Sequence, residues 1–204
     1  MTLLLLLCAC GAANTTAQTP IHLRNALHEQ GACGFRLDLR ADYGDYVRDF
    51  SLDCRGDGEG SASLKVLEPE VAAGIRAEVS GEDAAVSYLD TVLAVEQFTS
   101  RALSPMAAPG LLTACWGGGY IAEVLPDGEL EETRYLLGYG GRQLEISTWF
   151  QGEIPCRAEI SDGSQVLITC DISDFYLIKK ADDNGNQEDA EADLGGGGPE
   201  QPQP

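Results

Sequence analysis

Basic residues are scarce in this sequence. Lys and Arg total 13 against 33 Asp and Glu, and the formal net charge is −20. Residues 181–204 hold seven of the acids and no base, so taking that stretch away leaves −13 on the rest of the chain. Nucleic-acid binding is driven by cations that displace counterions from phosphates, and anionic lipid surfaces also attract cations. The composition therefore excludes nucleic acid as a partner and argues against electrostatic adhesion to lipid headgroups.

Histidine is also rare, with only His22 and His28 present. Six residues apart on one predicted helix, they lie about 240° apart around its axis and cannot share a metal ion. No Ser or Cys has a nucleophile-elbow context, and no phosphate-binding glycine loop follows a strand. The acidic stretches CRGDGEGS and DDNGNQED lack the ligand spacing of an EF-hand, which leaves solvated turns or a loose calcium loop as readings. We therefore expect no enzymatic activity, no catalytic residues, no metal and no cofactor.

A hydrophobic run long enough to span a membrane is missing, because such a helix needs roughly 20 apolar residues and the leucine run of MTLLLLLCACGAANT ends at Cys8. Its length suits a secretory signal, and Leu7-Cys8-Ala9-Cys10 resembles the lipobox of bacterial lipoproteins. That resemblance implies that residues 1–9 are removed and that Cys10 carries the lipid. Since the start lacks a Lys or Arg, we expect the true start to lie upstream. The alternative is an apolar strand, but five consecutive leucines do not alternate.

The first pair of cysteines falls in a predicted hairpin. In CGFRLDLRADYGDYVRDFSLDC, pairing about Tyr43-Gly44 sets Cys33 opposite Cys54, and the inward positions also include Phe35, Leu37, Phe50 and Leu52. Facing residues of an antiparallel pair lie close enough for a disulfide. We expect a Cys33–Cys54 bridge, with buried free thiols as the alternative.

A second hairpin is predicted in IPCRAEISDGSQVLITCDI. Asp162-Gly163 supplies the turn, and pairing about Gly163 sets Cys156 opposite Cys170, so a second bridge is expected there. Cys115 is left over and is expected to pack beside Trp116.

The remaining chain alternates well enough to form further strands. We expect these in 61–69, 74–80, 85–95, 120–137, 143–150 and 170–180, a short helix from Thr19-Pro20 to a stop at Gly31, and one or two helical turns across the sheet in LSPMAAPGLLTACW. These elements predict an α+β fold, a single curved antiparallel β-sheet forming a half-open barrel with an N-terminal helix and short helical insertions. The expected organisation is a signal in 1–9, an anchor and tether in 10–19, the folded domain in 20–180 and a disordered acidic tail in 181–204.

The order of these stretches resembles the superfamily of the outer-membrane lipoprotein carrier and its lipidated receptor. The likeness covers roughly Ile21 to Leu177 and rests on ADYGDYVRDFSLDC, VLEPEVAAGIRAEVS, LSPMAAPGLL and PCRAEISDGSQVLITCDISDF. The resemblance implies a curved sheet whose concave face, lidded by short helices, holds acyl chains.

Two functions follow as expectations. The leading one is a non-enzymatic lipoprotein, anchored in the cell envelope to the cytoplasmic or the outer membrane, that binds a hydrophobic or lipid-like ligand. Its ligand-binding residues would be Phe35, Leu37, Phe50 and Leu52, with Trp149 at the mouth of the concavity. The alternative is an envelope protein-interaction or scaffold module in which these side chains fill an ordinary core.

Overall fold

In the computed structural model, residues 17–42, 44–81, 83–88, 91–96 and 103–179 are described. They form one 11-stranded sheet in the order β6-β5-β4-β3-β2-β1-β11-β10-β9-β8-β7, with every neighbouring pair antiparallel. The helices are α1 (Gln18–Gln30), η1 (Glu70–Ala72), η2 (Pro105–Ala107) and α2 (Ala108–Gly118). The strands are β1 (Gly31–Asp42), β2 (Val47–Asp57), β3 (Ser61–Glu68), β4 (Arg76–Ser80), β5 (Asp83–Tyr88), β6 (Thr91–Glu96), β7 (Tyr120–Asp127), β8 (Leu130–Tyr139), β9 (Arg142–Gln151), β10 (Ile154–Asp162) and β11 (Gln165–Lys179).

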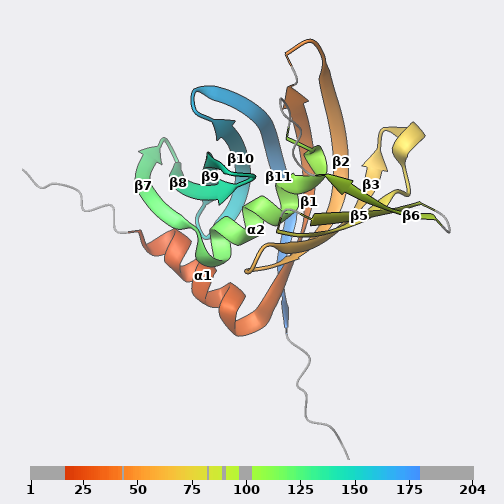
Figure 1. The fold of residues 1–204 in the computed structure, drawn as a ribbon. Coiled ribbons are helices and arrows are strands. Elements are labelled where there is room, and N and C mark those ends of the chain that lie inside the picture. The colour runs from red at the N-terminus through yellow and green to blue at the C-terminus, as the bar shows by residue number, and fades with distance from the viewer. Residues whose placement is uncertain (1–16, 43, 82, 89–90, 97–102, 180–204) are drawn as a thin grey trace, which may run out of the picture.

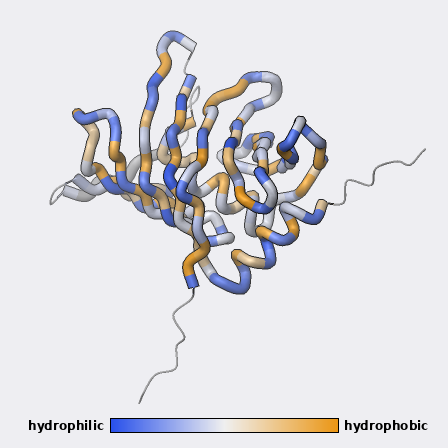
Figure 2. Tube along the Cα trace, turned by 180° about the vertical axis from the view of Figure 1, so that it is seen from behind, coloured by the Kyte–Doolittle hydropathy of each residue, from blue (hydrophilic) through white to orange (hydrophobic). Residues whose placement is uncertain are grey.

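The sheet is open and strongly curved, and the two main helices lie on its concave side (Figure 1). Two meanders, β1 to β6 and β7 to β11, are joined by the pairing of β1 with β11. The predicted half-open barrel with an N-terminal helix is confirmed. Hydrophobic and hydrophilic positions alternate along many of the strands (Figure 2), as a sheet with one buried face requires. No helix in the described part of the chain is long and apolar enough to span a membrane.

Helix α1 begins before the predicted position. It starts at Gln18, and Ala17 occupies the N-cap without a side-chain hydrogen bond, so the expected cap at Thr19 is wrong. Pro20 fits the first turn because the N–H that it lacks would have no partner there. The predicted stop is confirmed, since Gly31 has φ 96° and donates its N–H to the Leu27 carbonyl. Leu23 and Leu27 form the buried face.

The insertion LSPMAAPGLLTACW is more helical than expected. It forms η2 followed by the 11-residue α2, of which nine residues are buried. Glycine permits this burial, because a Cβ atom on Gly117 would lie 2.0 Å from the Gly58 carbonyl oxygen. A Cβ atom on Gly110 would lie 3.0 Å from the Gly60 carbonyl oxygen, a less severe contact. Helix α2 therefore rests directly on the backbone between β2 and β3, and close packing offsets the weak helix propensity of glycine.

The β1–β2 register differs from the prediction by two residues. Cys33 lies opposite Gly56 and Phe35 opposite Cys54, because the ladder closes with Asp42 opposite Val47 and leaves a longer turn than Tyr43-Gly44 alone. A shift of two residues preserves the face on which each side chain lies. The inward set is therefore as predicted, but the two cysteines do not face each other.

The second hairpin is displaced in the same sense. Cys170 lies opposite Ala158, and a bulge between Ile160 and Ser161 separates this register from the turn. Cys156 falls within another irregularity, between Pro155 and Arg157 in the β9–β10 ladder. Both predictions of facing cysteines are wrong, since a bulge inserts an unpaired residue that hydrophobic alternation does not reveal. The five described cysteines are free thiols: Cys33, Cys54, Cys115, Cys156 and Cys170.

Several predictions fall on residues outside the described ranges. These are the signal of residues 1–9, the lipidated Cys10 and the acidic tail of residues 181–204. They remain predictions.

Candidate functional site: the concave face of the sheet

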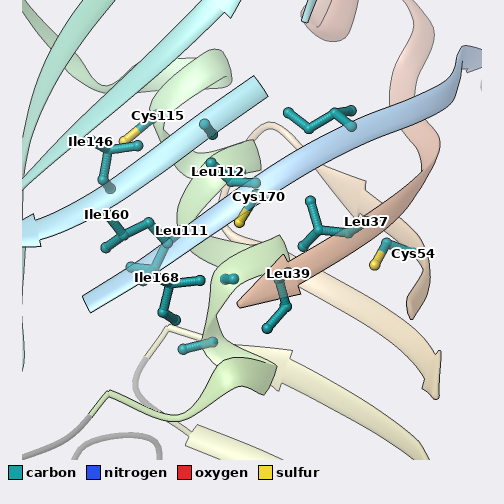
Figure 3. Close-up of a cluster of buried hydrophobic side chains, with 14 of the residues drawn as sticks. Leu37, Leu39, Cys54, Leu111, Leu112, Cys115, Ile146, Ile160, Ile168 and Cys170 are labelled. Carbon is teal, nitrogen blue, oxygen red and sulfur yellow. The ribbon is translucent and has the colours of Figure 1, made fainter. Parts of the chain in front are cut away.

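The concave face is lined by aliphatic side chains from both halves of the sheet. Four predicted ligand-binding residues lie on it. Phe35, Leu37 and Leu52 have exposed fractions of 1%, 0% and 1%, and Phe50, which lies opposite Leu39, is half-buried against the same core. Leucines of α2 meet isoleucines of β9, β10 and β11 beneath the helix (Figure 3). The side chains labelled there are Leu37, Leu39, Cys54, Leu111, Leu112, Cys115, Ile146, Ile160, Ile168 and Cys170.

Trp116 of α2 lies at the centre of this face. Its ring makes edge contacts with Phe35 at 5.4 Å and with Phe175 at 5.9 Å between ring centroids. Its Nε1 donates a hydrogen bond of 3.2 Å to Oγ1 of Thr148 on β9. Trp116 was not among the predicted site residues, although an aromatic residue in an almost wholly apolar segment was a usable signal.

Trp149 lies on the other face, which corrects its predicted place at the mouth of the concavity. It follows Thr148 on β9, and successive side chains of a strand point to opposite faces. Its Nε1 donates to Oδ2 of Asp127 at 2.9 Å, and the Arg157 guanidinium lies 4.6 Å from its ring centroid. Trp149 is 7% exposed because these polar partners cover it. It therefore belongs to the convex face.

A hollow lies on the convex side of the sheet, behind the strand segments that carry Leu39 and Phe50. The hollow has a volume of about 930 Å³ and is lined mainly by charged side chains of β1, β2, β10 and β11. Ion pairs cross it, including Arg36 with Asp38 at 3.6 Å and Arg40 with Asp49 at 3.8 Å. A charged lining disfavours an acyl chain, so this hollow is not the predicted hydrophobic site.

The thiols of the interior are poor nucleophiles. Burial raises the pKa of Cys33 to about 12, and it also raises the pKa of Cys54, Cys115 and Cys170 well above the ordinary value of a thiol. A neutral thiol neither attacks an electrophile nor binds metal readily. Within the described ranges, no group of three or more His, Cys, Asp or Glu side chains is placed to hold a metal ion. His22 instead meets Glu153, with Nδ1 and Oε1 2.9 Å apart.

The concave face is not uniformly apolar, which the sequence analysis missed. On β8 the inward positions include Thr133 and Tyr135, both fully buried, and β9 adds Thr148. The alternation in LEETRYLL places Thr133 and Tyr135 on one face, so the sequence did contain this signal.

Comparisons with known proteins give structural likenesses alone. No family model matches the sequence, and no curated protein matches it. The similar solved structures include a LolA superfamily protein from Nitrosomonas europaea, with 13% identity over 81% of this chain and 95% of the other and a TM-score of 0.46. An outer membrane lipoprotein-sorting protein domain from Vibrio parahaemolyticus has 8% identity over 84% and 93%, with a TM-score of 0.45. The lipoprotein LppX from Mycobacterium tuberculosis has 13% identity over 76% and 92%, with a TM-score of 0.35.

Two of these names belong to the superfamily that the sequence resembles. At such identities and TM-scores below 0.5, however, the likenesses carry no argument about the activity of this chain. The proposals below rest on its own residues.

Proposed function

We propose that the protein is a non-enzymatic lipoprotein of the cell envelope that binds a hydrophobic, acyl-chain-like ligand on the concave face. The observation that carries the proposal is that helices, not a second sheet, cover the apolar face of an open sheet. Helix α1 buries only the side chains of Pro20, Leu23 and Leu27 against the rest of the fold. A helix can therefore move away from the sheet without breaking the ladder of backbone hydrogen bonds.

Helix α1 is held less firmly than α2. It buries Pro20, Leu23 and Leu27, whereas α2 buries nine residues. Full burial of a leucine side chain contributes about 1.5–3 kcal/mol, and an exposed ion pair such as His22–Glu153 contributes about 0–1 kcal/mol. We therefore place ligand access beneath α1.

Anchoring fits this location. Cys10 is the lipidated residue of the proposal, and α1 begins at Gln18. Eight residue steps of extended chain reach at most about 29 Å. The folded body would therefore lie close to the bilayer, on the outer face of the cytoplasmic membrane or on the outer membrane, where a ligand is exchanged with lipid.

A second candidate function is an envelope protein-interaction or scaffold module. The observation that favours it is the complete burial of Phe35, Leu37, Leu52 and Trp116. Side chains buried to this degree also describe a filled core.

Native mass spectrometry of the protein extracted from membranes separates the two candidates. We expect a population with an added mass that organic solvent removes, and that lipid analysis identifies as an acyl-chain compound distinct from the covalent anchor. The matched control is the Cys10→Ala chain, which lacks the anchor and should still carry the mass. Protein with no bound hydrophobic molecule in either form would contradict ligand binding and favour the scaffold.

A further inference from the structure

The outer end of β2 is an open strand edge in the middle of the sheet. Residues 47–50 pair with β1 along their full length. On their other side, the pairing of β2 with β3 begins only at Ser51, which lies opposite Glu68. Within the described ranges, no strand pairs with this side of residues 47–50, and no other backbone hydrogen bond reaches it. Such an edge presents backbone donors and acceptors without partners.

The sequence explains why β3 leaves β2 at this point. Pro69 follows Glu68, and proline has no N–H with which to continue a ladder. The chain then turns through η1, and Gly74 donates its N–H to the Val66 carbonyl. None of the η1 residues is buried, and residues 44–49 are all exposed. The open edge is therefore accessible to a partner.

The outer strand β7 shows how this sheet blocks pairing elsewhere. Its ladder with β8 has a bulge between Ile121 and Glu123, and Pro126 lies near its end. Bulges and prolines are the devices that keep an exposed edge from pairing with another chain. Residues 47–50 contain neither a bulge nor a proline. Their edge is therefore competent to pair.

The convex hollow lies where β3 leaves β2. Its lining includes Asp49 and Ser51 of β2 and Glu68 and Pro69 at the end of β3, and it reaches Arg157 of β10. Successive residues of a strand point to opposite faces. A strand added beside residues 47–50 would therefore place every second side chain on the face that holds the hollow.

Carboxylates outnumber guanidinium groups in the hollow. The charged residues of its lining are Asp38, Asp49, Glu68 and Asp171, with Arg36, Arg40 and Arg157. Asp49 lies on the open edge, and Oδ1 of its carboxylate is 3.8 Å from Nε of Arg40, longer than a hydrogen bond. The two side chains are 73% and 64% exposed, and so loose a pair contributes little, which leaves Asp49 open to a second cation. The net charge of −20 on the whole chain attracts a basic partner to it.

We propose that this edge binds an extended, basic segment of a partner protein, which pairs with residues 47–50 as an added strand. In this mode of recognition, main-chain hydrogen bonds supply affinity and alternate side chains supply specificity. A lysine or arginine opposite Asp49 would lie at the hollow, and an apolar side chain opposite Phe50 would extend the concave face. The site does not depend on a ligand on the concave face.

The probe is a six-residue peptide that alternates lysine and valine and is acetylated and amidated at its ends. Two further copies carry backbone N-methyl groups, one copy on its lysines and the other on its valines. Each copy has one edge blocked, while its charge and side chains are unchanged. Binding to the full chain carrying Cys10→Ala is followed by the amide chemical shifts of the protein. We expect shifts centred on residues 47–50, and we expect one methylated copy to bind about tenfold or more weakly while the other binds as the parent does.

Asp49→Asn should weaken the parent peptide by about three- to fivefold, the effect of losing one cross-strand charge pair. Asp53→Asn is the matched control and should leave the affinity unchanged. Asp53 carries the same charge on the same face of β2, but it lies opposite Lys65 of β3, where β2 has no open edge.

Equal affinities of the three peptides, or equal effects of the two substitutions, would show charge attraction alone and overturn the proposal. Shifts centred on β7, or no binding at millimolar peptide, would also overturn it. Amides of residues 47–50 that resist hydrogen exchange before peptide is added would show that a second copy or another segment of the chain already occupies the edge, which contradicts a free site. None of these outcomes bears on acyl-chain binding.

Discussion

At the scale of single residues, close packing of glycine fixes where α2 lies. Gly117 contacts the backbone of Gly58 so closely that no larger residue fits, whereas a Cβ atom on neighbouring Gly118 would meet nothing within 4 Å. The position of α2 over the sheet thus depends on residue 117 being a glycine.

We therefore expect Gly117→Ala to lower the free energy of unfolding by about 1–3 kcal/mol, the usual cost of overpacking. Gly118→Ala, one residue further along the same helix, should change it by less than about 1 kcal/mol. Urea denaturation monitored by tryptophan fluorescence measures both. Equal effects of the two substitutions would show that α2 does not lie against the β2–β3 turn.

The buried thiols make stability depend on alkaline pH. The ordinary pKa of a cysteine thiol is 9.0, and burial raises the pKa of Cys33 to about 12. The unfolded chain therefore ionises first, so the stabilisation is complete below about pH 9 and is lost as the pH rises toward the folded-state pKa. The free energy of unfolding, measured in urea between pH 8 and 10.5 under reducing conditions, should fall by about 1.4 kcal/mol per pH unit for each such thiol above pH 9.

Cys170→Ala provides the comparison, because it should remove the contribution of one thiol and reduce the slope.

If the cysteines instead formed the two predicted bridges, the denatured and unreduced mature protein would expose one reactive thiol. The structure predicts five, and a thiol count on denatured protein distinguishes these numbers.

The residues also show what alternation in a sequence can and cannot predict. It correctly placed Phe35, Leu37 and Leu52 inward, because the face is conserved when the register shifts by two. It did not predict which cysteine faces which, since that depends on turn length and bulges. The prediction for Trp149 was wrong although the sequence held the answer. Alternation in QLEISTWF places the side chain of Trp149 on the face of the strand that does not carry Ile146 and Thr148.

At the scale of elements, α1 is the part of the fold that the proposal requires to move. His22 and Glu153 face each other across the gap between α1 and the β9–β10 turn, and both side chains are more than half exposed. This pair provides a point at which the helix can be fixed without altering the core.

In a His22→Cys, Glu153→Cys variant, a short bismaleimide linking the two thiols should abolish uptake of a fluorescent fatty acid. The reason is that α1 could no longer leave the sheet. The control is the same variant treated with N-ethylmaleimide, which blocks both thiols without joining them and should bind normally. Unchanged uptake by the crosslinked protein would place ligand access elsewhere.

The length of α2 was the main error at this scale. Two prolines and several small residues in LSPMAAPGLLTACW predicted only short turns, because glycine and proline weaken an isolated helix. The structure forms a full helix there because nine of its residues are buried. Tertiary packing of this kind is not visible in local sequence.

At the scale of the whole molecule, the pairing of β1 with β11 closes the sheet between its two halves. The meanders were predictable from the sequence, because each of their turns joins strands that are neighbours along the chain. The curvature of the sheet was predictable from the number of strands. The β1–β11 pairing joins segments more than 120 residues apart, and no turn sequence connects them to indicate that they pair. The fold class was therefore predictable, whereas the identity of the central strands was not.

Membrane attachment is a prediction for the whole chain. Cys10→Ala should move the protein from the membrane to the soluble fraction of fractionated cells, because the body is acidic and has no described helix able to span a bilayer. Cys8→Ala is the matched control and should leave the protein in the membrane fraction. Unchanged partitioning of the Cys10→Ala protein would contradict lipidation at this residue.

The central claim is that an acyl chain binds the concave face, and the two tryptophans of the chain test it most directly. Trp116 lies within the concave face and Trp149 on the convex face, so a brominated palmitate, which quenches fluorescence on near contact, reports which face it occupies. In a Trp149→Phe variant, the remaining emission of Trp116 should be quenched on titration. In a Trp116→Phe variant, the emission of Trp149 should be unaffected. Quenching of Trp149 alone, or of neither tryptophan, would contradict the account.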